Sequence, residues 1–169
     1  MLLLAAAAAR ARGPSLSRTG ADLKRCHSAQ LAVRLVRSGV AMGHIAQEGS
    51  FRNISTSPCT LRGYPGLQLL DGTGHRLRTE VMRGTAYTVP LVRVRTVVLA
   101  PRGGASFDLG YDDQTGYELA KCPTSTRVAI TPPNASKSIT LAWRIQPYGG
   151  SVTHLRCGRI TVSPVFARH

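Results

Sequence analysis

The chain has 169 residues, among them 17 glycines and 10 prolines, and this density of helix breakers leaves little room for a long amphipathic helix. Its 22 basic and 8 acidic residues give a formal net charge of +14, but the arginines are spread along the chain without interleaved aromatic residues, which disfavours a nucleic-acid-binding surface. We expect this charge to favour an anionic partner in the cell envelope instead, either a phospholipid headgroup or a phosphorylated polymer.

Residues 1–25 are predicted to be a truncated signal peptide or a flexible N-terminal tail. An unbroken apolar run from Met1 to Ala9 has the length of a signal-peptide hydrophobic region and is far too short to cross a bilayer. Arg10 and Arg12 follow this run instead of preceding it, the reverse of the usual order, so both alternatives stay open. We expect a secreted or cell-envelope protein without a transmembrane segment.

Alternating apolar and polar residues predict the strands. The first is expected over 31–36. A weaker strand is expected over 45–51, because Gln47 and Gly49 occupy positions where a core-facing strand favours branched side chains. The same pattern places further strands, in chain order, at 67–70, 76–82, 91–99, 105–109, 127–131, 139–145 and 158–165.

Turn residues separate these strands. A turn signal over 71–74 predicts that residues 76–82 return beside 67–70 as a hairpin. About seven to nine short strands at this spacing predict an all-β fold, an antiparallel β-sandwich over residues 26–166. The last residues, 167–169, are predicted to be a C-terminal tail.

Arg93 and Arg95 are the candidate anion-binding residues. Their spacing places both on one face of the predicted strand, with Val92 and Val94 on the other face. That face can bind anions, or its charges can protect an exposed edge against pairing with a strand of another chain. The sequence pattern favours edge protection, and the anion-binding alternative stays open.

The four cysteines form no C-x-x-C pair, which disfavours a zinc ribbon or a thioredoxin-like redox site and favours two disulfides. The alternative is four buried free thiols in a cytosolic protein. The spacing leaves three connectivities open. We predict Cys26–Cys59 and Cys122–Cys157, because these pairs close two loops of similar length that do not cross. Such pairing would leave no thiol for a catalytic Cys–His pair.

No motif predicts a catalytic, metal or cofactor site. Residues 104–108 break the G-x-S-x-G elbow of serine hydrolases at its second glycine, so Ser106 is expected to be an ordinary strand residue. The 5 histidines show neither H-x-H nor H-E-x-x-H spacing. The acidic residues Asp108, Asp112 and Asp113 lack the spacing of a calcium-binding loop, and we expect them to be solvated.

The most distinctive run of the chain is Ser57-Pro58-Cys59-Thr60-Leu61-Arg62-Gly63-Tyr64-Pro65. Around it stand, in chain order, Cys26, Gly43-His44, Asn53, Leu99-Ala100-Pro101, Gly104-Ala105, Cys122-Pro123 and Cys157. Over nearly all of residues 26–166 this order resembles the actinobacterial family catalogued as domain of unknown function 4232. The resemblance implies a secreted or lipoprotein immunoglobulin-like β-sandwich of mycobacteria and their relatives, with no assigned activity.

The chain departs from that family pattern in two places. Gln47, Glu48 and Gly49 stand where such proteins usually read more apolar. The residues Leu23-Lys24-Arg25 before Cys26 do not form a lipoprotein attachment sequence. We therefore expect export without lipid anchoring at Cys26.

These observations predict a non-catalytic binding or structural module of the cell envelope, with an arginine-rich surface that favours anions. Its partner would be an anionic envelope component or an envelope protein, and not a nucleic acid. One alternative is an envelope hydrolase whose site is assembled from distant residues, which a deep polar cleft with a histidine beside an acid and a hydroxyl would favour. The other is a nucleic-acid-binding protein, which export would exclude.

Overall fold

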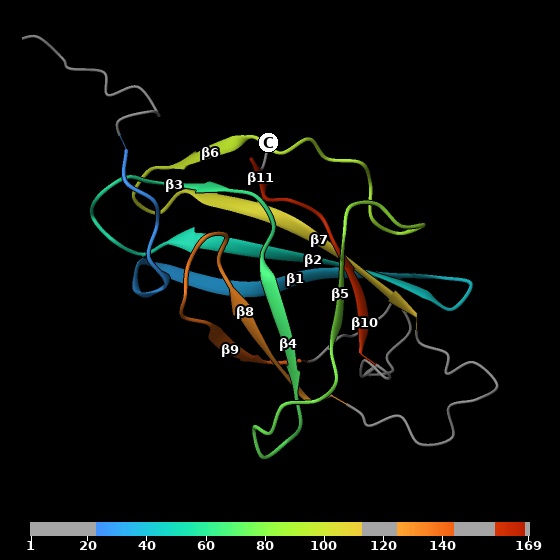
Figure 1. Ribbon diagram of the computed structural model, residues 1–169. Helices are drawn as coiled ribbons and strands as arrows, with labels where there is room; N and C mark the ends of the chain where they lie inside the picture. Colours follow the sequence, from blue (N-terminus) through green and yellow to red (C-terminus); the bar gives the residue numbers. More distant parts are fainter. Residues whose placement is uncertain (1–22, 113–124, 144–157, 168–169) are drawn as a thin grey trace, which may run out of the picture.

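The computed structural model describes residues 23–112, 125–143 and 158–167, which form eleven β-strands in three sheets (Figure 1). A short 3₁₀ helix, Ser28–Gln30, precedes the first strand. The strands are β1 (Leu31–Ala41), β2 (His44–Asn53), β3 (Cys59–Arg62), β4 (Gly66–Leu70), β5 (Glu80–Arg83), β6 (Thr96–Leu99), β7 (Gly104–Asp112), β8 (Arg127–Thr131), β9 (Ile139–Ala142), β10 (Arg159–Val162) and β11 (Phe166–Ala167). Within these ranges no helix is long and apolar enough to cross a membrane.

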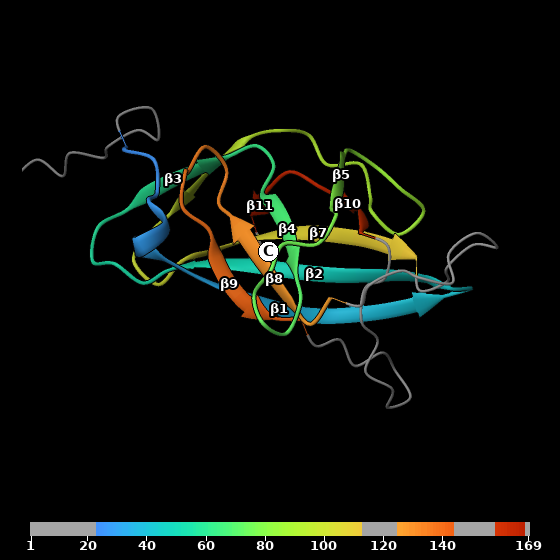
Figure 2. The ribbon, with the colours of Figure 1, turned by 60° about the horizontal axis from the view of Figure 1, so that its bottom comes forward.

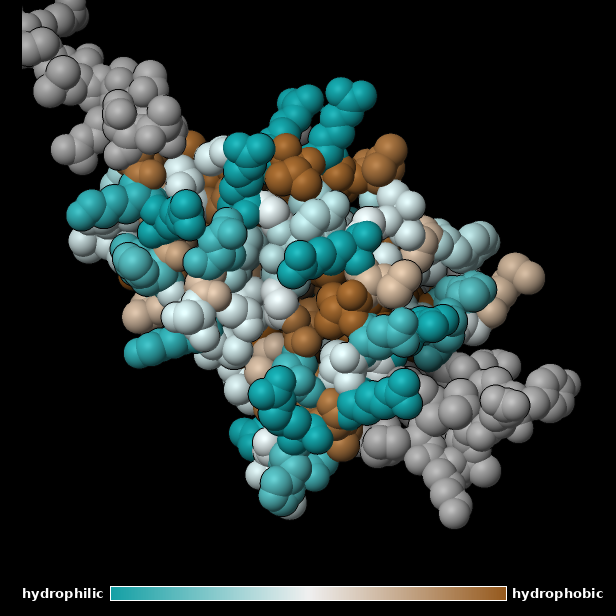
Figure 3. Space-filling view, viewed as in Figure 1, coloured by the Kyte–Doolittle hydropathy of each residue, from teal (hydrophilic) through white to brown (hydrophobic). Residues whose placement is uncertain are grey.

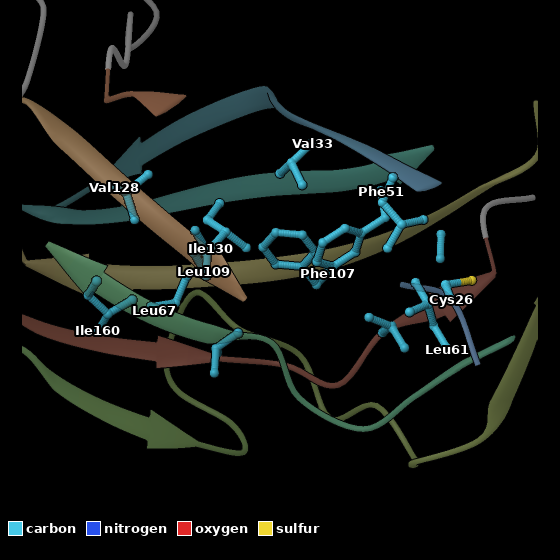
Figure 4. Packing of buried hydrophobic residues seen from close by; sticks show 14 of the residues in the cluster. Cys26, Val33, Phe51, Leu61, Leu67, Phe107, Leu109, Val128, Ile130 and Ile160 are labelled. Carbon is cyan, nitrogen blue, oxygen red and sulfur yellow. The ribbon is translucent and has the colours of Figure 1, made fainter. Parts of the chain in front are cut away.

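The largest sheet has the order β1-β2-β7-β10-β5, with β11 beside β7. The two smaller sheets, β4-β8-β9 and β3-β6, lie over one face of it, as Figure 1 and the turned view of Figure 2 show. Buried apolar side chains fill the space between the layers, where Phe51 of β2 packs against Phe107 of β7 (Figure 4). The predicted all-β class is confirmed.

The number and direction of the strands differ from the prediction. The described residues hold eleven strands rather than seven to nine, because β3 and the two-residue β11 lie where alternation predicted no strand. The pairing is not purely antiparallel either, since β5 lies parallel to β10. Arg159 stands opposite Glu80 in this ladder, and their side chains pair at 3.4 Å.

The predicted hairpin between β4 and residues 76–82 forms only next to the turn. An antiparallel bridge joins Leu70 to Arg76, and the N–H groups of Asp71 and Leu77 donate to the carbonyls of His75 and Leu69, at 3.0 and 2.9 Å. Beyond this point the side chain of Gln68 replaces ladder hydrogen bonds: its amide group donates to the Leu77 carbonyl at 2.7 Å. The chain then turns away from β4 and pairs with β10 instead.

The predicted strand over 91–99 is formed only in its second half. Residues 91–95 have no strand partner in the described part of the chain, and β6 begins at Thr96. Burial explains the difference, because Val97 and Leu99 reach the core whereas Leu91 is 82% exposed. Without a buried face, residues 91–95 are not held against a neighbouring strand.

The strand expected to be weak, β2, is instead the second strand of the large sheet and pairs on both sides. Gly49 is required there by its neighbour: a Cβ atom at position 49 would lie 2.2 Å from Cζ of Phe107. The Phe107 ring fills the space that a branched side chain at this position would occupy. The glycine is therefore part of the core packing and not a weakness of the strand.

Gly49→Ala is expected to lower the free energy of unfolding by about 1–3 kcal/mol, because the added methyl group overpacks the core against Phe107. Urea unfolding would measure this loss. Gly39→Ala is the matched control, since no atom lies within 4 Å of a Cβ at that position, and its effect is expected within about 0.5 kcal/mol. If Gly49→Ala lowers the free energy of unfolding by the same amount in a Phe107→Leu protein, the packing explanation is contradicted.

The first predicted disulfide, Cys26–Cys59, is present, with the two Cα atoms 4.9 Å apart. Both cysteines are buried. The bond joins the segment before β1 to β3, so it ties this segment to the β3-β6 sheet. The second predicted pair, Cys122–Cys157, lies outside the described residues.

Candidate functional site

Three arginines from separate parts of the chain line one hollow on the outer face of the large sheet. Arg34 lies on β1, Arg52 on β2 and Arg102 on the turn between β6 and β7. The hollow has a volume of about 540 Å³, and its other lining residues are Leu35, Val36, Ser50 and Gly104. Its volume is in the range of small-molecule sites, and its positive lining favours anions.

The strand register explains why these side chains converge. Arg34 lies opposite Ser50 across the β1–β2 ladder, and Arg52 lies opposite Gly104 across the β2–β7 ladder. Because side chains alternate between the two faces of a sheet, Ser50 and Arg52 share the outer face while Phe51 between them is buried. Gly104 carries no side chain, which leaves this part of the surface open.

The Arg102 turn is held by the buried side chain of Asn53, at the end of β2. The side-chain nitrogen of Asn53, Nδ2, donates to the backbone carbonyls of Ser57, Leu99 and Ala100, at 2.8, 3.2 and 3.3 Å. The Arg102 N–H in turn donates to the Asn53 carbonyl at 2.9 Å. Arg102 has a φ of 67°, uncommon for a residue other than glycine. These contacts fix the backbone that carries the third arginine.

Within the described residues, none of the three arginines has a carboxylate partner. All three are exposed, and the ion pairs between described residues involve other side chains. Glu48, on the outer face of β2, accepts a hydrogen bond from Ser106 and does not line the hollow. The three positive charges therefore give the hollow a positive potential toward solvent.

The residues predicted from sequence, Arg93 and Arg95, lie elsewhere. Both are exposed and precede β6 in the segment without strand pairing, so the prediction that they share one face of a strand is wrong. Neither is among the residues that line the hollow of the three arginines. The structure does not bring Arg93 and Arg95 into this site.

A second basic hollow lies where β3 and β6 meet the turn between β8 and β9. It is smaller, about 270 Å³, and its two arginines are Arg25 and Arg62. Asn134, in the turn, donates its side-chain amide to the Arg62 carbonyl at 3.0 Å. With fewer charges and about half the volume, this hollow is the weaker anion site.

One histidine–carboxylate pair lies at the end of the large sheet. His44 Nδ1 contacts the Asp112 carboxylate, and the Tyr87 ring lies with its centroid 5.1 Å from that of His44. Both members of the pair are solvent-exposed, at 43% and 63%. With this exposure, the described residues do not enclose the pair in a deep polar cleft of the kind that would favour a hydrolase.

A second such pair lies in the turn after β4. The Thr73 hydroxyl donates to the Asp71 carboxylate at 2.6 Å and contacts His75 Nδ1 at 2.7 Å. The hydrogen bond from Thr73, and those from backbone N–H groups, lower the pKa of Asp71 to about 2. Because the hydroxyl proton points to Asp71, His75 does not activate Thr73 as a nucleophile. The three side chains form a hydrogen-bonded turn.

No group of three or more histidine, cysteine, aspartate or glutamate side chains among the described residues is placed to hold a metal ion. Two of the acidic residues considered for calcium, Asp108 and Asp112, lie on β7, while Asp113 lies outside the described residues. Because Asp112 contacts His44, it is not simply a solvated loop residue, which corrects that part of the prediction.

Sequence reasoning missed Arg34, Arg52 and Arg102 because they are far apart in the chain and form no motif. Alternation places Arg34 and Arg52 on outward faces of their strands, but only the pairing register shows that they are neighbours. Met42 and Gly43 form the turn between β1 and β2, with φ values of 51° and 84°, as in a tight two-residue hairpin turn. Even a correctly placed turn would not give the pair Arg34–Ser50, because a bulge between Leu35 and Arg37 shifts the β1–β2 register by one residue.

Comparison with known proteins gives one match. The model of the family described as Domain of unknown function (DUF4232) matches residues 26–165. No curated protein and no solved structure was found to match. The matched region contains all three arginines of the hollow and the Cys26–Cys59 disulfide.

Proposed function

Because this chain belongs to the family of domain of unknown function 4232, whose description assigns no activity, we propose its function from its own surface. The protein is a non-catalytic module, exported to the cell envelope, that binds a phosphate-bearing anion in the hollow of Arg34, Arg52 and Arg102. The observation that carries this proposal is the convergence of three arginines without a carboxylate partner in the described residues. The immunoglobulin-like topology and the actinobacterial origin implied by the sequence are part of the same proposal.

The chemistry of the lining supports phosphate as the ligand group. A guanidinium group presents its N–H donors in a planar fork that matches two phosphate oxygens. Ser50, between Arg34 and Arg52 on the same face, offers a further hydroxyl donor. Val36, which is 40% exposed, gives the rim an apolar side, against which the uncharged part of a larger ligand would pack.

The disulfide supports the location. Disulfides persist in oxidising compartments and are rare in the cytosol, and Cys26–Cys59 is buried. Fractionation of cells that make the native protein is expected to recover it outside the cytoplasm. Recovery in the cytosol would contradict export and would reopen nucleic-acid binding as the role of the basic surface.

Replacing the three arginines together, as Arg34→Gln, Arg52→Gln and Arg102→Gln, is expected to weaken binding of tripolyphosphate at least about a hundredfold. Loss of two charge-assisted hydrogen bonds of roughly 1.5 kcal/mol each accounts for that factor. Isothermal titration calorimetry at fixed ionic strength would measure it. Vesicles of phosphatidylglycerol in phosphatidylcholine form a second arm, and distinguish a lipid headgroup from a soluble phosphorylated polymer as the source of the phosphate.

The matched control is the variant Arg76→Gln, Arg78→Gln and Arg127→Gln, which removes the same charge from exposed positions outside the hollow. Its affinity for tripolyphosphate is expected to change by less than about threefold, since exposed charges at a distance are screened. Equal losses in the two variants would show diffuse attraction to a basic surface, and the hollow would not be the site.

A further inference from the structure

The strand β3 has partners on both sides. Thr60 uses both of its backbone groups on the segment before β1, because it donates to the Lys24 carbonyl and accepts from the Cys26 N–H, each at 3.0 Å. Neighbouring residues of a strand direct their backbone groups to opposite sides. Cys59 and Leu61 therefore direct theirs to β6.

Among the strands that the structure describes, β6 has a partner on one side only. Val97 and Leu99 lie opposite these two residues of β3, so their backbone groups face β3. The N–H and C=O groups of Thr96 and Val98 face the other way, and within the described part of the chain no backbone hydrogen bond reaches them. The described residues therefore leave one edge of β6 free.

The chain that leads into β6 prolongs this edge. Residues 90–95 contain no turn or bend, and no backbone hydrogen bond between described residues involves them. Leu91 is 82% exposed, Val94 40% and Val98 49%. Figure 3 shows apolar side chains between long hydrophilic ones along the upper margin of the molecule, over β6 and the segment before it.

This edge carries only positive charge. No acidic residue occurs in the sequence between Glu80 and Asp108, and Arg93 and Arg95 are both exposed. Neither arginine has a carboxylate partner among the described residues. A strand laid along β6 would meet two guanidinium groups beside an apolar strip.

We propose that the free edge of β6 binds an extended, acidic segment of a partner protein as an added strand. The backbone groups of Thr96 and Val98 would form ladder hydrogen bonds with the segment, as in other strand-addition complexes. Carboxylates of the segment would pair with Arg93 and Arg95, and its apolar side chains would cover Val94 and Val98. This site is separate from the hollow of the three arginines and does not rest on the function proposed for it.

The charge decides against a second copy of this chain as the partner. Two copies that pair along β6 would bring Arg93 and Arg95 of both chains to one interface, between proteins that each carry a net charge of +14. Like charges at an interface cost several kcal/mol. The same two arginines repel a second copy of this chain and attract an acidic strand. They therefore both protect the edge and select its partner.

The test uses the full chain and a fluorescein-labelled peptide of eight residues, alternating valine and glutamate, in fluorescence anisotropy titrations. Two further peptides carry backbone N-methyl groups, one on all valines and the other on all glutamates. An added strand directs only one of these two sets of N–H groups toward β6. We therefore expect one methylated peptide to lose binding more than about tenfold and the other to retain it, whereas equal binding of the two would overturn the proposal.

The protein variant Arg93→Glu with Arg95→Glu is expected to lose peptide affinity more than about tenfold, because like charges replace opposite ones. Arg76→Glu with Arg78→Glu changes the net charge equally at exposed positions away from β6 and is expected to bind normally. Equal loss in both variants would overturn the proposal. The proposal would also be overturned if the unmodified chain dimerises with rising concentration in sedimentation velocity and the dimer does not bind the peptide.

Discussion

Loss of the Cys26–Cys59 disulfide is expected to lower the free energy of unfolding by about 3–4 kcal/mol. The bond closes a loop with a sequence separation of 33 residues, and the chain-entropy model gives roughly this cost for a loop of that length. It also holds the segment before β1 on the side of β3 away from β6. The domain would lose a large fraction of the 5–15 kcal/mol that is typical of small proteins.

The measurement is urea unfolding of the double variant Cys26→Ala with Cys59→Ala, which leaves no unpaired thiol at either position. A variant that replaces Cys122 and Cys157 in the same way is the companion experiment, because sequence reasoning predicts a second disulfide there. Intact mass with and without reductant counts the disulfides beforehand. A loss below about 1 kcal/mol for the first variant would contradict a structural role for Cys26–Cys59.

Asn53→Ala is expected to destabilise the protein by about 3 kcal/mol, since several hydrogen bonds of a buried side chain are lost and their partners are left without them. The Asn53 side chain is fully buried, and its oxygen also accepts from the N–H and hydroxyl of Ser55. The substitution would also release the turn that carries Arg102. We therefore expect affinity for tripolyphosphate to fall by about tenfold, the effect of one lost charged hydrogen bond.

Thermal or urea unfolding together with calorimetric titration would check both effects of Asn53→Ala in one preparation. Ser55→Ala is the control, because it removes one hydroxyl at the same corner without touching the carbonyls of Leu99 and Ala100. Unchanged tripolyphosphate affinity in a folded Asn53→Ala protein would show that Arg102 is positioned by other contacts or does not touch the ligand.

Strands with regular alternation between clear breakers could be predicted from the sequence. The predicted bounds of β8, 127–131, agree with the structure, and the first strand begins at Leu31 as predicted. Both have a buried and an exposed face that the pattern of branched residues reflects. Alternation indicates that a strand exists, but it contains no information on which strand lies beside it.

The sequence did not predict which strands pair with each other or which side chains pack together. The parallel ladder of β5 with β10 joins residues about eighty positions apart, for which a turn signal gives no guidance. Gly49 looked unfavourable because its neighbour Phe107, which needs the empty space, stands far along the chain. The arginine hollow could not be predicted for the same reason. Arg34, Arg52 and Arg102 become neighbours only through the strand register and an irregular turn.

The burial of Asn53 has a practical consequence for production of this protein. Asn53-Ile54-Ser55 and Asn134-Ala135-Ser136 both match the acceptor pattern for N-linked oligosaccharides. A glycan on the Asn53 side-chain nitrogen would replace one of the two N–H donors that hold three carbonyls and would have to fit into the core, whereas Asn134 is exposed. In a eukaryotic secretory host, glycosylation of Asn53 before folding would therefore yield chains that cannot fold. The structure favours production in the periplasm of a bacterial host.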